Sequence, residues 1–155
     1  MFKIGRSLGI VALVVLGASC TPRASNEADP KQRLTDYIAI SFSAKKEADR
    51  EKLLDYLSGG AKNRLISWSD EQFKQAFVDS KRQFVKLAIR EIKNISPTEA
   101  NVTYELTYMD QTKGADARVT NKRMCEMVLD SGKWTIREVH NIKELIEYKN
   151  EMSLP

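Results

Sequence analysis

The sequence has few of the residues that bind metals or carry redox chemistry. Its 155 residues include one histidine and two cysteines, and neither a CxxC nor an HExxH spacing occurs. Zinc sites and dithiol centres need several such residues at defined spacings. We therefore expect no metal site and no cofactor.

Long apolar runs and blocks of one charge are also missing. The net charge is +4, and removing Lys3 and Arg6 from the 25 cations leaves 23 against 21 anions. The cations are interspersed, unlike those of a phosphate-binding surface, so we expect no nucleic-acid partner. The longest apolar run covers about ten residues, whereas a membrane-spanning helix needs roughly 20.

The first 20 residues follow the pattern of a bacterial export signal. Lys3 and Arg6 precede the apolar run Leu8–Gly17, and small residues lead to Cys20. The Gly17-Ala18-Ser19-Cys20 ending resembles a bacterial lipobox, in which the cysteine is acylated, for example with palmitate, and becomes the N-terminus. We expect residues 1–19 to be a signal peptide and Cys20 to be the lipidated residue. Ordinary secretion and an uncleaved anchor are the alternatives.

This resemblance implies a lipid-anchored protein of the cell envelope that contacts the bilayer through acylated Cys20. Residues 20–29 are mostly small and polar, as in a flexible tether that extends at most about 30 Å. Thr21 stands where the lipoprotein-sorting pattern has an aspartate for inner-membrane retention. We therefore expect the outer membrane, with the protein facing the periplasm.

Residues 30–150 form one expected domain, with helices over about 30–80. Asp29 can cap a helix from Pro30 to about residue 45, with Gln32 reaching back. Its apolar stripe consists of Leu34, Tyr37, Ile38 and Phe42. A second helix over about 47–58 would end at Gly59-Gly60.

Two further helical pieces are expected before the strands. One covers residues 62–67, with Leu65 and Ile66 directed inward. The other begins with a Ser69/Gln72 capping box and ends near residue 80. Trp68 would pack on Phe73 beside this box, and a ligand-stacking role is the alternative for Trp68.

From residue 82 to about 140 the apolar spacing changes to that of strands. Alternation is clearest at Val102, Tyr104, Leu106 and Tyr108. The preceding strand would carry a bulge near Arg90-Glu91. Strands over 118–129 and 134–140 would be joined by a turn at residues 130–133. Asn141 can cap a last helix over about 142–150.

The register of the last two strands predicts a candidate site. Pairing Leu129 with Trp134 also pairs Met127 with Ile136, and by extension Cys125 with Glu138 and Arg123 with His140. The expected pocket residues are Tyr104, Tyr108, Arg123, Cys125, Trp134, Glu138 and His140. His140 could transfer protons. The alternative is a solvated sheet margin with core tyrosines and a buried structural cysteine.

Helices followed by an antiparallel meander define an α+β fold. Three features carry a family resemblance: Cys20, the Leu34–Phe42 stripe and the hairpin at Gly132-Lys133-Trp134. They resemble small bacterial lipoproteins with a nuclear-transport-factor-two-like (cystatin-like) domain of unknown function, over residues 30–140. This resemblance implies N-terminal helices packed on a curved, cone-like sheet of four strands.

The expected function is non-catalytic binding of a small apolar ligand or an envelope protein. A structural or assembly factor without a pocket is one alternative. A small hydrolase or isomerase using His140 with Glu138 or a tyrosine is the other. The enzymes of this superfamily supply no catalytic set that matches this chain, and the fold alone does not determine function.

Overall fold

The computed structural model describes residues 29–149, and Cys20, the expected signal and residues 20–28 of the expected tether lie outside this range. The helical half consists of α1 (Pro30–Ser43), η2 (Glu47–Asp49), α2 (Arg50–Leu54), α3 (Gly59–Ser67), α4 (Asp70–Phe73) and η3 (Lys74–Val78). The sheet consists of β1 (Arg82–Ser96), β2 (Glu99–Asp110), β3 (Arg118–Asp130) and β4 (Lys133–Glu147). The strands are antiparallel in the order β1-β2-β3-β4.

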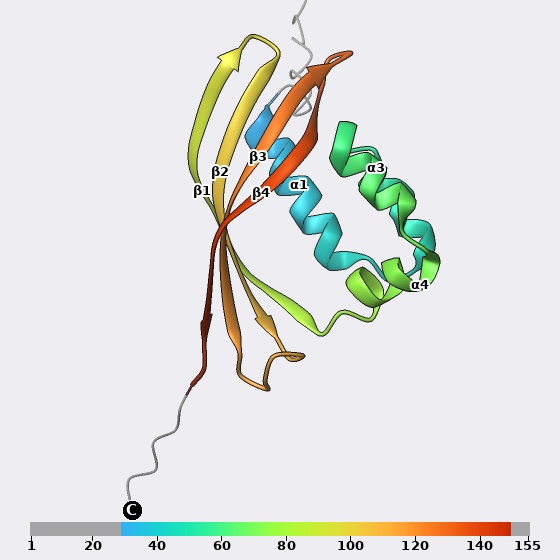
Figure 1. Cartoon of the computed structure of the whole chain (residues 1–155), viewed down its shortest axis with the longest axis vertical. Coiled ribbons are helices and arrows are strands. Elements are labelled where there is room, and N and C mark those ends of the chain that lie inside the picture. The colour runs from blue at the N-terminus through green and yellow to red at the C-terminus, as the bar shows by residue number, and fades with distance from the viewer. Residues whose placement is uncertain (1–28, 150–155) are drawn as a thin grey trace, which may run out of the picture.

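The helices cover one face of this twisted sheet, which we call the inner face; the opposite face is the outer face (Figure 1). This arrangement confirms the predicted α+β fold, with N-terminal helices on a curved four-stranded meander. None of the helices within residues 29–149 combines the length and the apolar character needed to cross a bilayer.

Helix α1 begins as predicted. The Asp29 carboxylate accepts the Lys31 N–H at 2.9 Å, and Pro30 occupies the first turn. Gln32 does not reach back, because its side-chain amide donates to Asp36 at 2.7 Å. Leu34 and Ile38 are buried against the sheet, so the apolar stripe places α1 over the inner face.

The prediction that Gly59-Gly60 ends a helix was wrong: both glycines begin α3. After α2 the chain runs beside β4, where the Ser58 N–H donates to the Ile136 carbonyl at 2.9 Å and the Ile136 N–H donates to the Tyr56 carbonyl at 2.8 Å. These bonds satisfy the edge of β4, which a helix through residue 58 would leave unpaired. Gly59 then turns the chain with a φ of +50°.

The other helical predictions hold in part. The Ser69/Gln72 capping box is confirmed. Leu65 is buried, whereas Ile66 is 55% exposed and does not point inward. The ring that Trp68 approaches is Phe77, at a centroid distance of 6.0 Å, and Phe77 stacks on Phe73 at 4.9 Å. The helix continues past Phe73 as the π-helical turn η3.

The sheet register confirms the Leu129–Trp134 and Met127–Ile136 pairs and the irregularity between Ile89 and Glu91. The two extended pairs were wrong. A register shift between Glu126 and Met127 places Cys125 opposite Val139 and Met124 opposite His140. The cause is one extra residue in β4, Arg137, and such a bulge changes the face that the side chains directly after it occupy.

The predicted last helix over residues 142–150 was also wrong. β4 continues to Glu147, which pairs with Arg118. Without this extension the first half of β3 would have no partner on that side for its backbone N–H and C=O groups. Ile142 and Leu145 remain 54% and 47% exposed, while Ile146 packs partly against the core.

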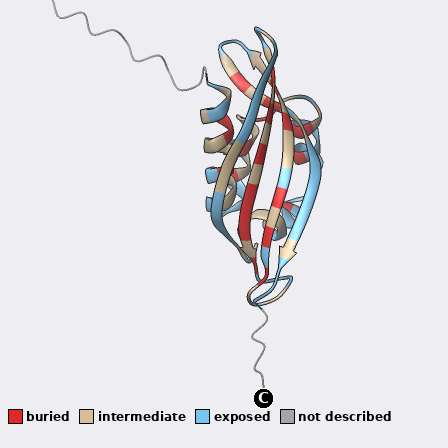
Figure 2. Cartoon of the chain, turned by 90° about the vertical axis from the view of Figure 1, so that its left-hand side faces the viewer, coloured by how far each residue is buried: buried red, intermediate tan, exposed pale blue. Residues whose placement is uncertain are grey.

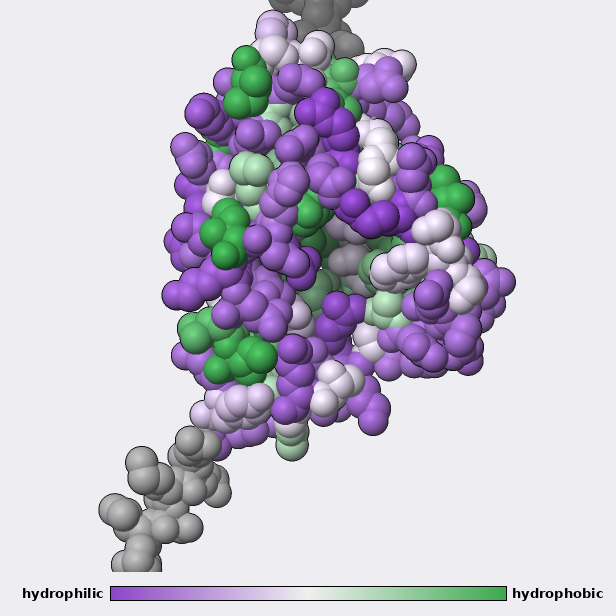
Figure 3. All heavy atoms as spheres, viewed as in Figure 1, coloured by the Kyte–Doolittle hydropathy of each residue, from purple (hydrophilic) through white to green (hydrophobic). Residues whose placement is uncertain are grey.

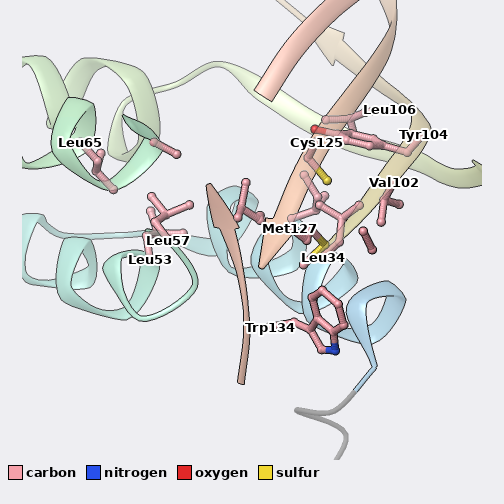
Figure 4. Packing of buried hydrophobic residues seen from close by; sticks show 14 of the residues in the cluster. Leu34, Leu53, Leu57, Leu65, Val102, Tyr104, Leu106, Cys125, Met127 and Trp134 are labelled. Carbon is pink, nitrogen blue, oxygen red and sulfur yellow. The ribbon is translucent and has the colours of Figure 1, made fainter. Parts of the chain in front are cut away.

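The core lies between the helices and the inner face. Along β2 the residues Val102, Tyr104, Leu106 and Tyr108 are buried, as their alternation predicted. Figure 2 shows the buried positions concentrated on the central strands. Figure 4 shows Leu34 of α1 beside Met127, close to the Cys125 and Val102 side chains. This packing fixes the walls of a hollow between the helices and the inner face.

Candidate functional site

A cavity of about 290 Å³ lies between the inner face and the helices. A smaller hollow of about 140 Å³ beside α3 shares four of its residues. Figure 3 shows a depression on this side of the molecule, with apolar and weakly polar side chains inside a polar rim. The cavity is lined by Tyr37, Ile38, Ser41, Phe42, Trp68, Ala76, Phe77, Ser80, Arg82, Tyr104, Leu106, Tyr108, Arg123 and Val139.

Three tyrosines supply polar atoms to an otherwise largely apolar wall. Burial raises the pKa of Tyr104 and of Tyr37, and the nearby Arg123 charge opposes this only in part. Both phenols therefore stay protonated at neutral pH and can donate or accept hydrogen bonds. The Tyr108 hydroxyl accepts from the buried Asn121 side chain at 3.1 Å.

Two arginines line the cavity, and no aspartate or glutamate does so in the described part of the chain. Arg82, at the start of β1, donates to the Ala76 carbonyl and lies 5.9 Å from the centroid of the Tyr108 ring. Arg123 of β3 lies beside Tyr104, and its Nε is buried without a hydrogen-bond partner. The cavity is therefore positively charged.

The structure brings together three of the seven predicted pocket residues: Tyr104, Tyr108 and Arg123. Cys125 is fully buried behind the cavity wall, and burial raises the pKa of its thiol to about 12. Trp134 is buried beside the start of α1, where its carbonyl accepts from Arg33 Nε at 3.0 Å. Figure 4 shows Cys125 near Tyr104 and Trp134 away from both.

Glu138 and His140 do not form the predicted mouth. Glu138 pairs with Arg64 of α3, which lowers the pKa of this carboxyl to about 2. His140 Nε2 lies 3.0 Å from Glu126 Oε1. Because the neighbouring Val139 lines the cavity, His140 points to the outer face. The bulge at Arg137 accounts for the position of His140, and the ion pair with Arg64 accounts for that of Glu138.

Outside the cavity, Glu126 joins a charged network on the outer face. Arg137 lies 3.1 Å from Glu126 and 2.9 Å from Glu99. The network therefore holds His140 on the side of the sheet away from the cavity. Acid–base chemistry in the cavity would need this imidazole.

Sequence reasoning missed part of the cavity wall. Tyr37 was expected only as part of an apolar stripe, although its hydroxyl could have indicated a hydrogen-bonding role. Arg82 lies at a strand start, and no pattern in the neighbouring residues marks it as a cavity residue. Phe77 and Ala76 reach the cavity from η3, and π-helical turns are frequent at functional sites.

The lining residues suit binding better than covalent chemistry. The hydroxyls of Ser41 and Ser80 donate to the carbonyls of Ile38 and Phe77, at 2.7 and 3.3 Å, and no basic side chain is their partner. Within residues 29–149, no three His, Cys, Asp or Glu side chains gather as metal ligands. The cavity thus offers aromatic surfaces, hydroxyls and two guanidinium groups.

No family model matches the chain, and no curated protein matches it in sequence. Among solved structures, a SEC-C motif-containing protein from Rhodopseudomonas palustris aligns with a TM-score of 0.56, at 12% identity, over 76% of this chain and 81% of that one. The intermembrane space region of the chloroplast protein ARC6 aligns with a TM-score of 0.53, at 14% identity, over 72% and 92%.

A third structure, an NTF-2-like protein of unknown function from Shewanella oneidensis MR-1, aligns with a TM-score of 0.49, at 15% identity, over 73% of this chain and 98% of that chain. At these identities the first two likenesses concern the fold alone. Fold and cavity together define a class: an α+β domain with helices over a hollow, curved sheet.

Proposed function

We propose that this protein is a non-catalytic binding domain that holds a small ligand in the cavity beneath α1. The observation that carries the proposal is the cavity itself, about 290 Å³ in volume, with aromatic walls and a few convergent polar groups. Small-molecule sites have this composition, and their volumes begin near 300 Å³. The ligand is therefore small.

The two alternative functions have less support. A structural or assembly factor would be favoured by a closed apolar interior, and the cavity weighs against it. A hydrolase or isomerase would need His140 beside a carboxylate in the cavity. His140 instead meets Glu126 on the outer face, and Tyr37 and Tyr104, whose pKa values are raised by burial, keep their protons.

The proposal includes attachment to the cell envelope through acylated Cys20. Its support is the sequence pattern of residues 1–20, since Cys20 lies outside the described residues. The Cys20→Ala variant should move from the membrane pellet to the soluble fraction, whereas Cys125→Ser should stay with wild type in the pellet. Retention of Cys20→Ala in the pellet would refute the lipid anchor.

The ligand-binding proposal is tested by recovering the ligand. Full-length protein is isolated from cell envelopes in a non-ionic detergent, and native mass spectrometry measures any co-purified small molecule. Ser41 lines the cavity, so Ser41→Phe should fill it and abolish the adduct. Ser67→Phe is the matched control: Ser67 is exposed and, like Ser41, donates to the carbonyl three residues earlier. An adduct that persists in Ser41→Phe would overturn the proposal, as would the absence of any adduct from wild type if no small-molecule probe binds the protein either.

A further inference from the structure

We infer that the ligand is a small carboxylate with an aromatic or apolar body, and that Arg123 binds its carboxylate group inside the cavity. The inference rests on the proposed function and specifies the chemical class of the ligand. Three observations carry it: the pairing of the arginines, the position of Arg123, and the walls around it.

Most arginines of the described chain have a carboxylate within 4 Å. This holds for Arg33, Arg50, Arg64, Arg90 and Arg137. The two cavity arginines, Arg82 and Arg123, have none among residues 29–149, although both are shielded from solvent more than the exposed Arg64 and Arg90. A guanidinium withdrawn from water without a counter-charge is costly, and a bound anion removes that cost.

Arg123 is placed to bind the anion. Its Nε is buried and has no protein partner, and its charge acts on the phenols of Tyr37 and Tyr104. A planar guanidinium binds a carboxylate through two parallel hydrogen bonds. The two protonated phenols can donate to the remaining lone pairs of the same oxygens.

The second arginine favours a monoanion over a phosphate. Arg82 donates to the Ala76 carbonyl and lies near the Tyr108 ring, so part of its guanidinium is already bound. Arg64, beside the smaller hollow, is neutralised by Glu138. Arg123, with its unpaired Nε–H and aromatic neighbours, therefore matches a single carboxylate rather than a doubly charged group.

The remaining walls accept the apolar body of the ligand. Phe42, Trp68 and Phe77 line the cavity. Phe77 is held in place by stacking on Phe73 at 4.9 Å, and Phe42 contacts the Tyr108 ring at 5.8 Å. Such fixed aromatic faces pack against a flat or hydrocarbon group with little loss of entropy.

The test compares an acid with its neutral isostere. The probes are 4-phenylbutyrate and 4-phenylbutyramide, titrated into the full-length protein in a non-ionic detergent at pH 7. Binding is measured by isothermal titration calorimetry, and Trp68 fluorescence, with Trp68→Phe as the blank, reports occupancy of the cavity. The acid should bind at least about tenfold more tightly than the amide, because a charge-assisted pair is stronger than a neutral one.

Two variants separate charge recognition from general binding. Arg123→Gln should weaken the acid about tenfold or more and leave the amide unchanged, whereas Arg64→Gln should change neither. Equal affinity of wild type for acid and amide would overturn the carboxylate assignment and leave the proposed function standing. A co-purified ligand without an acidic group would do the same. If neither probe binds and no adduct is recovered, both the inference and the proposed function fail.

Discussion

Arg33 ties α1 to two other parts of the fold, and replacing it gives a quantitative test of that role. Its guanidinium donates to the Trp134 carbonyl at 3.0 Å, and to the Asp55 carbonyl and carboxylate at 2.7 and 2.8 Å. It also lies 3.8 Å from the centroid of the Tyr56 ring. Only 4% of Arg33 is exposed, so its removal takes a donor away from the buried Trp134 carbonyl.

Arg33→Met keeps much of the apolar stem and removes these polar contacts. A carbonyl left buried and unpaired costs about 1–3 kcal/mol, and the lost cation–π contact costs about 0.5–2 kcal/mol. We expect the free energy of unfolding to fall by about 3 kcal/mol. For a domain of this size that corresponds to about 12 °C in Tm. Urea unfolding followed by circular dichroism measures it, with an unchanged m-value.

The matched control is Asp55→Asn, which removes the ion pair but keeps the backbone carbonyl that Arg33 binds. The Asp55 side chain is 55% exposed, and exposed pairs contribute at most about 1 kcal/mol. If Asp55→Asn destabilised the protein as much as Arg33→Met, or if Arg33→Met cost less than 1 kcal/mol, the carbonyl contacts would not be the source of the stability.

Three further predictions concern other sites. Arg64→Gln should raise the pKa of Glu138 from about 2 toward its ordinary value of 4.5, as measured by NMR titration. Because the ion pair lowers the pKa of Glu138 in the folded state, the stabilisation from this pair is present above the unfolded-state pKa and is lost as the pH falls through about 2. An unchanged pKa of Glu138 in the variant would contradict this. In a Cys20→Ala background, Cys125 should resist iodoacetamide at pH 8 in the native state and react after unfolding, because burial raises the pKa of its thiol to about 12; equal labelling in both states would refute the burial argument. Gly59→Ala should lower the free energy of unfolding by about 1–2 kcal/mol, since φ is +50° and the new Cβ would lie 2.9 Å from a β4 side-chain carbon; denaturation at the wild-type midpoint would contradict this.

Much of the fold could be predicted from local pattern. The stripe of α1, the capping box at Ser69 and the alternation along β2 are each encoded by neighbouring residues. The Leu129–Trp134 register followed from keeping apolar residues on one face. These features depend on contacts within a few residues or across one turn.

The site was only partly predictable for a different reason. Tyr104 and Tyr108 follow from the same alternation, but a single extra residue at Arg137 turned His140 to the outer face, and Arg64 of α3 pairs with Glu138. The extension of β4 to Glu147 and the pairing of Tyr56–Ser58 with its edge also depend on distant strands. Hydrogen bonds to those strands outweigh the local preference for helix.

By itself the sequence determined that helices precede an antiparallel sheet, the inner-face residues of β2 and the export-like pattern of the first residues, because periodicity and composition are local properties. Only the tertiary structure decided that Arg82 and Arg123 meet three tyrosines around one hollow, while His140 lies outside it. Those residues are far apart along the chain, and their meeting depends on sheet register, a bulge and the packing of α1, which local sequence does not encode.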